Sequence, residues 1–163
     1  MLYSEKVLEH FRNPRNVGEI EDADGVGDVG NPTCGDMMRL TIKVDPETDR
    51  LVDVRFQTLG CGAAIATSSI ITELVKGKTI AEALEVSNKT VVEQLGGLPP
   101  VKMHCSLLAE QGLVAALIDY YRRHPDKQPP PELEEKARRL AKVDPHDVKT
   151  EEEETTSVSS EEE

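Results

Sequence analysis

The stretch MMRLTIKVDPETDRLVDVRFQTL, residues 37–59, decides the fold class. Its first half alternates apolar and polar residues: Met38, Leu40, Ile42 and Val44 against Arg39, Thr41 and Lys43. Its second half does the same: Val52, Val54 and Phe56 against Asp53, Arg55 and Gln57. A period of two is typical of strands with one buried and one solvated face, and PETD between the halves is a turn. The pattern predicts an antiparallel hairpin, with Val52 on the buried face and Thr41 on the solvated face.

On both sides of the hairpin the apolar period is helical. A short helix is expected between Ser4 and the breaker NP at 13–14, and a connection rich in Gly and Asp then leads to Cys34. Further helices are expected at 63–76, near 80–86 and 89–95, at 106–123 and at 132–142. The sum is an α+β fold, a small antiparallel sheet with helices packed on one face.

Length and charge limit the possible domain organisation and the possible classes of function. The 163 residues suit one domain over 1–125, a short charged helical extension over 126–143 and an acidic disordered tail over 144–163. The segment 151–163 holds seven glutamates and no cation, so it accounts for seven of the net -12 charges and leaves -5 for the rest. Neither part supplies the basic face that nucleic acid requires.

Cysteine usage and hydropathy indicate the compartment. Three cysteines are an odd number, so a closed disulfide framework is excluded and a reducing compartment is expected. The sequence shows no signal peptide and no apolar run of membrane-spanning length, so the expectation is a soluble, cytoplasmic protein without membrane contact.

The three cysteines lie where predicted elements meet. Cys34 precedes a strand, and Cys61 and Cys105 precede helices; Asp36 follows the first cysteine, and His104 stands directly before the third. Helix N-termini favour the thiolate, the form that binds metal or attacks sulfur. Four such ligands would complete a zinc site or hold a 2Fe-2S cluster. A single cysteine is more often a small buried apolar residue, but this coincidence favours a metal or cluster site.

A thiol enzyme is an alternative that the same residues leave open. Cys61 at a helix start, with His104 as a base, would form a nucleophile and base pair. Such an enzyme needs a substrate pocket, and two Phe, three Tyr and no Trp offer little to line one. We therefore expect a protein without catalytic turnover of its own.

Four motifs together resemble one known family. They are NPRNVG (13–18), GNPTCGD (30–36), TLGCGAAIATSS (58–69) and GGLPPVKMHCS (96–106), with 26 and 43 residues between successive cysteines. In order and spacing they are similar to the IscU family of scaffolds, over about residues 3–124. The resemblance implies an IscU-like fold that accepts sulfur from a cysteine desulfurase, binds iron, builds a 2Fe-2S cluster and passes it to apo acceptor proteins. Zinc is expected as an occupant of the cluster-free form, and a monomer or small homo-oligomer as the assembly.

The resemblance also implies roles for particular residues. The ligand set is Cys34, Cys61 and Cys105, with His104 and Asp36 competing for the fourth role, and Cys105 ahead of Cys61 as sulfur acceptor. Asp36, a hard and readily hydrated ligand, suits cluster release. The pentapeptide Leu98, Pro99, Pro100, Val101 and Lys102 resembles the docking site of an Hsp70-type chaperone, and its polyproline character suits docking.

The branches of this family differ in features that the sequence contains. The SufU branch, zinc-dependent sulfurtransferases that carry persulfide, typically has an insertion between the second and third cysteines and lacks the histidine. This chain has His104 and no visible insertion, which favours the IscU branch. NifU proteins continue into a second domain with further cysteine motifs, and no cysteine follows Cys105 here.

Overall fold

The computed structural model describes residues 3–31 and 35–141, so Cys34 and the acidic tail at 144–163 lie outside the described residues. Within them, β1 (Gly25–Asn31), β2 (Asp36–Val44) and β3 (Leu51–Leu59) form a three-stranded sheet in the order β1-β2-β3. Both pairs of neighbours are antiparallel. The hairpin predicted from residues 37–59 is therefore confirmed.

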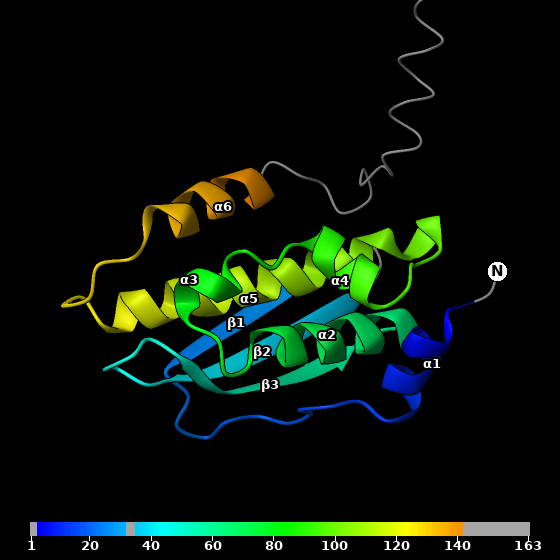
Figure 1. The fold of residues 1–163 in the computed structure, drawn as a ribbon, viewed down its shortest axis with the longest axis horizontal. Coiled ribbons are helices and arrows are strands. Elements are labelled where there is room, and N and C mark those ends of the chain that lie inside the picture. The colour runs from blue at the N-terminus through cyan, green and yellow to red at the C-terminus, as the bar shows by residue number, and fades with distance from the viewer. Residues whose placement is uncertain (1–2, 32–34, 142–163) are drawn as a thin grey trace, which may run out of the picture.

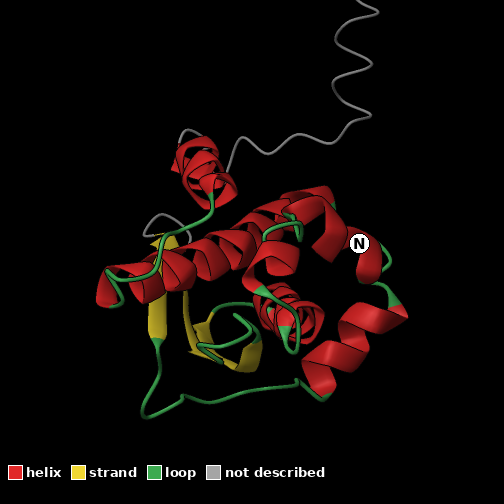
Figure 2. Ribbon diagram, turned by 60° about the vertical axis from the view of Figure 1, so that its left-hand side comes forward, coloured by secondary structure: helices red, strands yellow, loops and turns green. Residues whose placement is uncertain are grey.

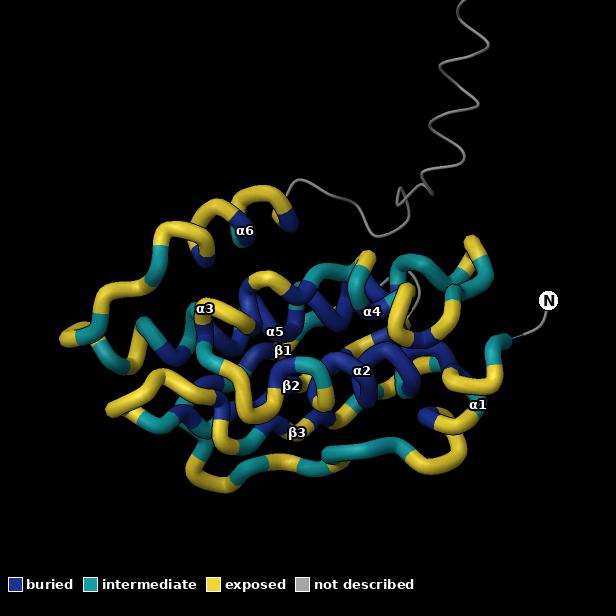
Figure 3. Tube along the Cα trace, viewed as in Figure 1, coloured by how far each residue is buried: buried dark blue, intermediate teal, exposed yellow. Residues whose placement is uncertain are grey.

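Helices cover one face of this sheet, as predicted (Figures 1 and 2). In chain order they are α1 (Glu5–Arg12), α2 (Gly62–Val75), α3 (Ile80–Ala83), α4 (Asn88–Gln94), a 3-10 turn (Pro100–Lys102), α5 (Met103–Arg123) and α6 (Pro131–Ala141). The helices α2 and α5 contact the strands directly, and α6 packs on α5. The buried residues of the strands and of α2 and α5 form one continuous core between the two layers (Figure 3).

Strand β1 was not expected, because the sequence pattern reads as a Gly-rich connection. Two of its glycines, Gly25 and Gly27, are required by the close approach of α5. A Cβ at Gly25 would lie 2.4 Å from the carbonyl oxygen of Ala116, and a Cβ at Gly27 would lie 2.3 Å from that of Gly112. The strand therefore lacks the β-branched and aromatic residues by which strands are recognised.

Two side chains of the hairpin differ from the prediction in their exposure to solvent. Thr41 is buried because the N-terminal segment crosses the sheet there, and the Ile20 amide donates to its hydroxyl oxygen at 3.2 Å. Val52 is 52 % exposed, whereas Leu51 is fully buried. An irregularity in the β2–β3 register between Lys43 and Val44 shifts the alternation by one residue at the start of β3.

The long helix α5 begins at Met103, three residues earlier than expected, so His104 and Cys105 belong to its first turn. Although no membrane-spanning run is expected from the sequence, the stretch Pro100–Arg123 is long and apolar enough to cross a membrane by length and composition. Most of it is buried inside the domain, as is usual for the core helix of a globular protein. Packing against the sheet and α2 accounts for its apolar character.

Candidate metal centre

Three of the predicted ligands meet at one end of the sheet. The Nε2 of His104 lies 3.1 Å from the Oδ2 of Asp36 and 3.6 Å from the Sγ of Cys105. The Cys105 Sγ lies 3.9 Å from the same carboxylate oxygen. One donor atom from each residue lies within 4.8 Å of the others, so the three could bind one metal ion.

Separate elements position these side chains. Asp36 is the first residue of β2, and His104 and Cys105 are in the first turn of α5. The carboxylate also depends on Gly60, which follows β3, because a Cβ there would lie 2.7 Å from the Oδ1 of Asp36. Gly60 carries no signal of this role in the sequence, since a glycine beside a cysteine reads as a flexible joint. The close approach that requires it exists only in the folded chain.

Cys61 extends the cluster towards α2. It occupies the N-cap position of that helix, and its Sγ lies 4.0 Å from the Sγ of Cys105. Cys61 is partly exposed. The pKa of Lys102 is raised above its usual value, chiefly by the negative charge of the Cys61 thiolate. An ammonium group therefore lies near this sulfur.

Cys105 differs from Cys61 in its surroundings. It is 1 % exposed and packs with Ala63 and Ala64, with Tyr3 and Leu98 beside them. Burial strongly raises the pKa of its thiol, and the neighbouring charges of Cys61 and Asp36 raise it further. Cys105 is therefore a buried thiol and not a surface one. The two alanines and the helix start enclose it, and sequence spacing does not reveal that enclosure.

The remaining predicted site residues lie around this cluster or outside the described part. Cys34 belongs to the residues that the structure does not describe. The segment 98–102 forms the approach to α5, with Val101 59 % exposed and Leu98 and Lys102 partly buried. This segment thus presents an apolar side chain to solvent next to the thiols.

The donor set has a defined chemistry. Thiolate and imidazole nitrogen are ligands that zinc and iron accept, and a carboxylate adds a harder oxygen donor that water displaces more readily. The three donors are shielded, because the side chains of His104 and Asp36 are only 13 % and 10 % exposed. The arrangement suits a metal or a small cluster held at the edge of the domain.

A family model and two curated relatives show which known proteins this chain resembles. Residues 2–127 match a family model described as the NifU-like N terminal domain. The chain is 60 % identical over 123 residues to iron-sulfur cluster assembly scaffold protein IscU 1 of Archaeoglobus fulgidus, covering 76 % of this chain and 79 % of that protein. It is also 60 % identical over 118 residues to the IscU scaffold protein of Aquifex aeolicus, covering 72 % and 75 %.

A solved structure shares the fold. It is that of a proposed iron-sulfur cluster assembly scaffold of the SUF system from Fervidobacterium islandicum. The two structures align with a TM-score of 0.58 at 28 % identity, over 71 % of this chain and 96 % of the other. The α+β fold expected from the motifs is thus confirmed by both the sheet topology and this neighbour.

Proposed function

The chain belongs to the NifU-like N-terminal domain family, and from that premise we propose that it is a scaffold on which an iron-sulfur cluster is assembled and from which the cluster is transferred. One observation carries the proposal beyond family membership. Donor atoms from β2, from the start of α2 and from the start of α5 converge at one end of the sheet. A cluster with several irons needs ligands from several directions, and this convergence supplies them.

The ligands that we propose are Cys34, Cys61 and Cys105, with Asp36 or His104 as the fourth. The contacts between Asp36, His104, Cys105 and Cys61 support four members of this set. The cargo that we propose is a 2Fe-2S cluster, because four ligands of this kind match the needs of its two irons. Zinc would occupy the same donors when no cluster is present.

Sulfur would arrive as a persulfide on a cysteine desulfurase. A scaffold thiolate would attack its outer sulfur, the S–S bond of the persulfide would break, and the desulfurase cysteine would leave as a thiolate. Cys61 and Cys105 are the proposed acceptors. In the metal-free protein we place Cys61 first, because it is partly exposed and lies near the Lys102 ammonium, whereas Cys105 is buried. Metal binding would favour deprotonation of Cys105 and bring it into use.

Transfer to apo acceptor proteins requires a ligand that leaves easily. Asp36 is the proposed ligand for this step, because its oxygen is the hardest donor of the set. We also propose that an Hsp70-type chaperone docks on the segment 98–102, where exposed Val101 follows two prolines. The acceptor protein and the chaperone would then approach the same end of the domain.

Anaerobic reconstitution tests this function. The full-length chain is incubated with ferrous iron, cysteine, a reductant and a cysteine desulfurase, and visible absorption is recorded. We expect a reddish protein whose absorption disappears in a variant lacking Cys61 and Cys105 and whose cluster passes to an apo-ferredoxin. A colourless protein that keeps zinc and carries persulfide would instead support the sulfurtransferase alternative.

A further inference from the structure

The helix α6 lies beyond the residues that match the family model, yet it packs as an integral part of the domain. One face of the helix is buried and consists of Leu133, Lys136 and Leu140. The two leucines join the main core. A lysine at the centre of an apolar face is unusual, because burying its charge is costly unless every donor is satisfied.

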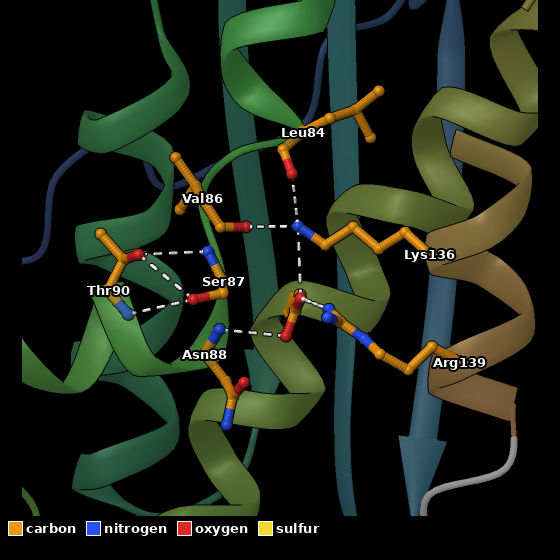
Figure 4. Close-up of polar contacts among 8 residues, drawn as sticks. Leu84, Val86, Ser87, Asn88, Thr90, Lys136 and Arg139 are labelled. Carbon is orange, nitrogen blue, oxygen red and sulfur yellow. Dashed lines mark hydrogen bonds and ion pairs between the residues drawn. The ribbon is translucent and has the colours of Figure 1, made fainter. Parts of the chain in front are cut away.

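Lys136 has partners for all three of its N–H donors (Figure 4). Its Nζ lies 2.7 Å from the carbonyl oxygens of Leu84 and of Val86, which belong to the link between α3 and α4. It lies 3.2 Å from the Oε1 of Glu110 on α5. A single ammonium group thus joins α6, the α3–α4 link and α5.

Glu110 is the second centre of this network. Its side chain is 0 % exposed, and its Oε2 accepts the backbone N–H of Asn88 at 3.0 Å. The Nη2 of Arg139 also donates a hydrogen bond to the Glu110 Oε1 at 3.1 Å, but the Arg139 side chain is 62 % exposed, so water screens this ion pair. Lys136 is therefore the buried counter-charge of the Glu110 carboxylate.

Because of where Glu110 lies in the chain, its contacts also affect the metal centre. Asn88 begins α4, and the chain then runs through the segment 96–102 into α5. The hydrogen bond between Asn88 and Glu110 joins the two ends of the segment 88–110. His104 and Cys105 lie within this segment. Whatever holds Glu110 in place also limits the movement of these two side chains.

We propose that α6 is a clamp, in which Lys136 and Glu110 act as positioning residues that hold the segment carrying His104 and Cys105 in one place. The role of those two side chains as ligands rests on the proposed function, whereas the clamp itself is a property of the metal-free chain. Removing the Lys136 charge leaves a buried carboxylate without its buried partner, which is strongly unfavourable. The segment 84–110 should then open while the sheet stays closed.

Hydrogen exchange of the metal-free, full-length chain tests the clamp. In Lys136→Met, amides of residues 84–110 and 131–141 should exchange about tenfold faster or more, with those of β2 and β3 unchanged. The matched control is Arg138→Met, which removes an exposed cation from the same helix and should leave exchange within about twofold. Faster exchange confined to 131–141, or equal acceleration throughout the domain, would overturn the proposal.

Two further measurements address the charge and the ligands. Adding Glu110→Gln to Lys136→Met removes the unpaired buried charge and keeps an acceptor for Asn88, so exchange should be about threefold slower than in Lys136→Met alone.

Alkylation by iodoacetamide, followed by peptide mapping, reports on Cys105 directly. We expect about tenfold faster alkylation of Cys105 in Lys136→Met than in the wild type. No gain at Cys105, or no slowing in the double variant, would contradict a clamp that acts through this ion pair.

Discussion

The imidazole of His104 and the carboxylate of Asp36 lie 3.1 Å apart, which joins the first turn of α5 to the first residue of β2. Both side chains are nearly buried. This pair brings one nitrogen and one oxygen donor together before any metal arrives. Because two different elements hold the pair, changes at either residue are expected to alter the metal centre without removing the core.

Replacing Asp36 by Ala should slow cluster release. The carboxylate is a hard, easily hydrated ligand, and without it water and acceptor thiols lose an entry route. The cluster should therefore survive longer in air and transfer more slowly, as followed by visible absorption. Asp126→Ala, at an exposed position beyond the end of α5, is the control. A shorter lifetime in Asp36→Ala would mean that the residue mainly supports its loop.

Replacing Gly60 by Ala should weaken metal binding while the fold persists. The added Cβ would lie 2.7 Å from the Oδ1 of Asp36 and 2.9 Å from the Cβ of Ala64, so the carboxylate must move. Displacing a ligand through its support typically lowers metal affinity about 10- to 100-fold. Zinc affinity, measured by competition with a chromophoric chelator, checks this.

Gly62→Ala is the matched control for the change at Gly60. Its Cβ would approach only the ring of Phe11, at 3.2 Å, and Phe11 is 47 % exposed and free to shift. Its zinc affinity should stay within about threefold of the wild type. Equal losses in both variants would show that the loop, rather than the Asp36 carboxylate, determines affinity.

The two described cysteines should differ in reactivity in the metal-free protein. Cys105 is 1 % exposed and its pKa is raised by burial, so few molecules present its thiolate at neutral pH. Cys61 is partly exposed near Lys102. Peptide mapping after brief alkylation should find Cys61 modified at least about tenfold faster than Cys105. Similar rates would mean that Cys105 is exposed in solution.

Acidification below about pH 6.5 should destabilise the chain through His10. This residue is buried, and its Nδ1 lies 2.8 Å from the Oγ of Ser69. Burial, assisted by Arg15, lowers its pKa below the ordinary 6.5, although Glu73 and Glu9 oppose the shift and Lys6 adds to it. The unfolded chain then binds the proton more readily, so the stability present above pH 6.5 is lost as the pH falls through the lowered pKa.

The matched variant for this effect is His10→Gln, which keeps a hydrogen-bonding group for Ser69 but does not titrate. Urea unfolding of the metal-free protein at pH 7 and pH 5 gives the comparison. The wild type should lose more stability between these values than the variant, at up to about 1.4 kcal/mol per pH unit. An equal loss in both proteins would exclude His10 as the cause.

Local periodicity was sufficient to predict most of the elements. The alternation in residues 37–59 predicts β2 and β3, and the helical spacing predicts α1, α2 and the body of α5. The four motifs, three of which contain a cysteine, predict the family that the comparisons show. These features are legible in the sequence because each depends on neighbours two to four residues away.

Other features of the protein were decided only by the tertiary structure, because they depend on contacts between residues that are distant in the sequence. The approach of α5 requires Gly25 and Gly27 in β1. A register shift buries Leu51, and the start of α2 encloses Cys105. Lys136 reads as one of several charges on a polar helix, yet it is buried against Glu110. Sequence patterns record the faces of single elements, whereas packing decides which faces meet and which polar groups they enclose.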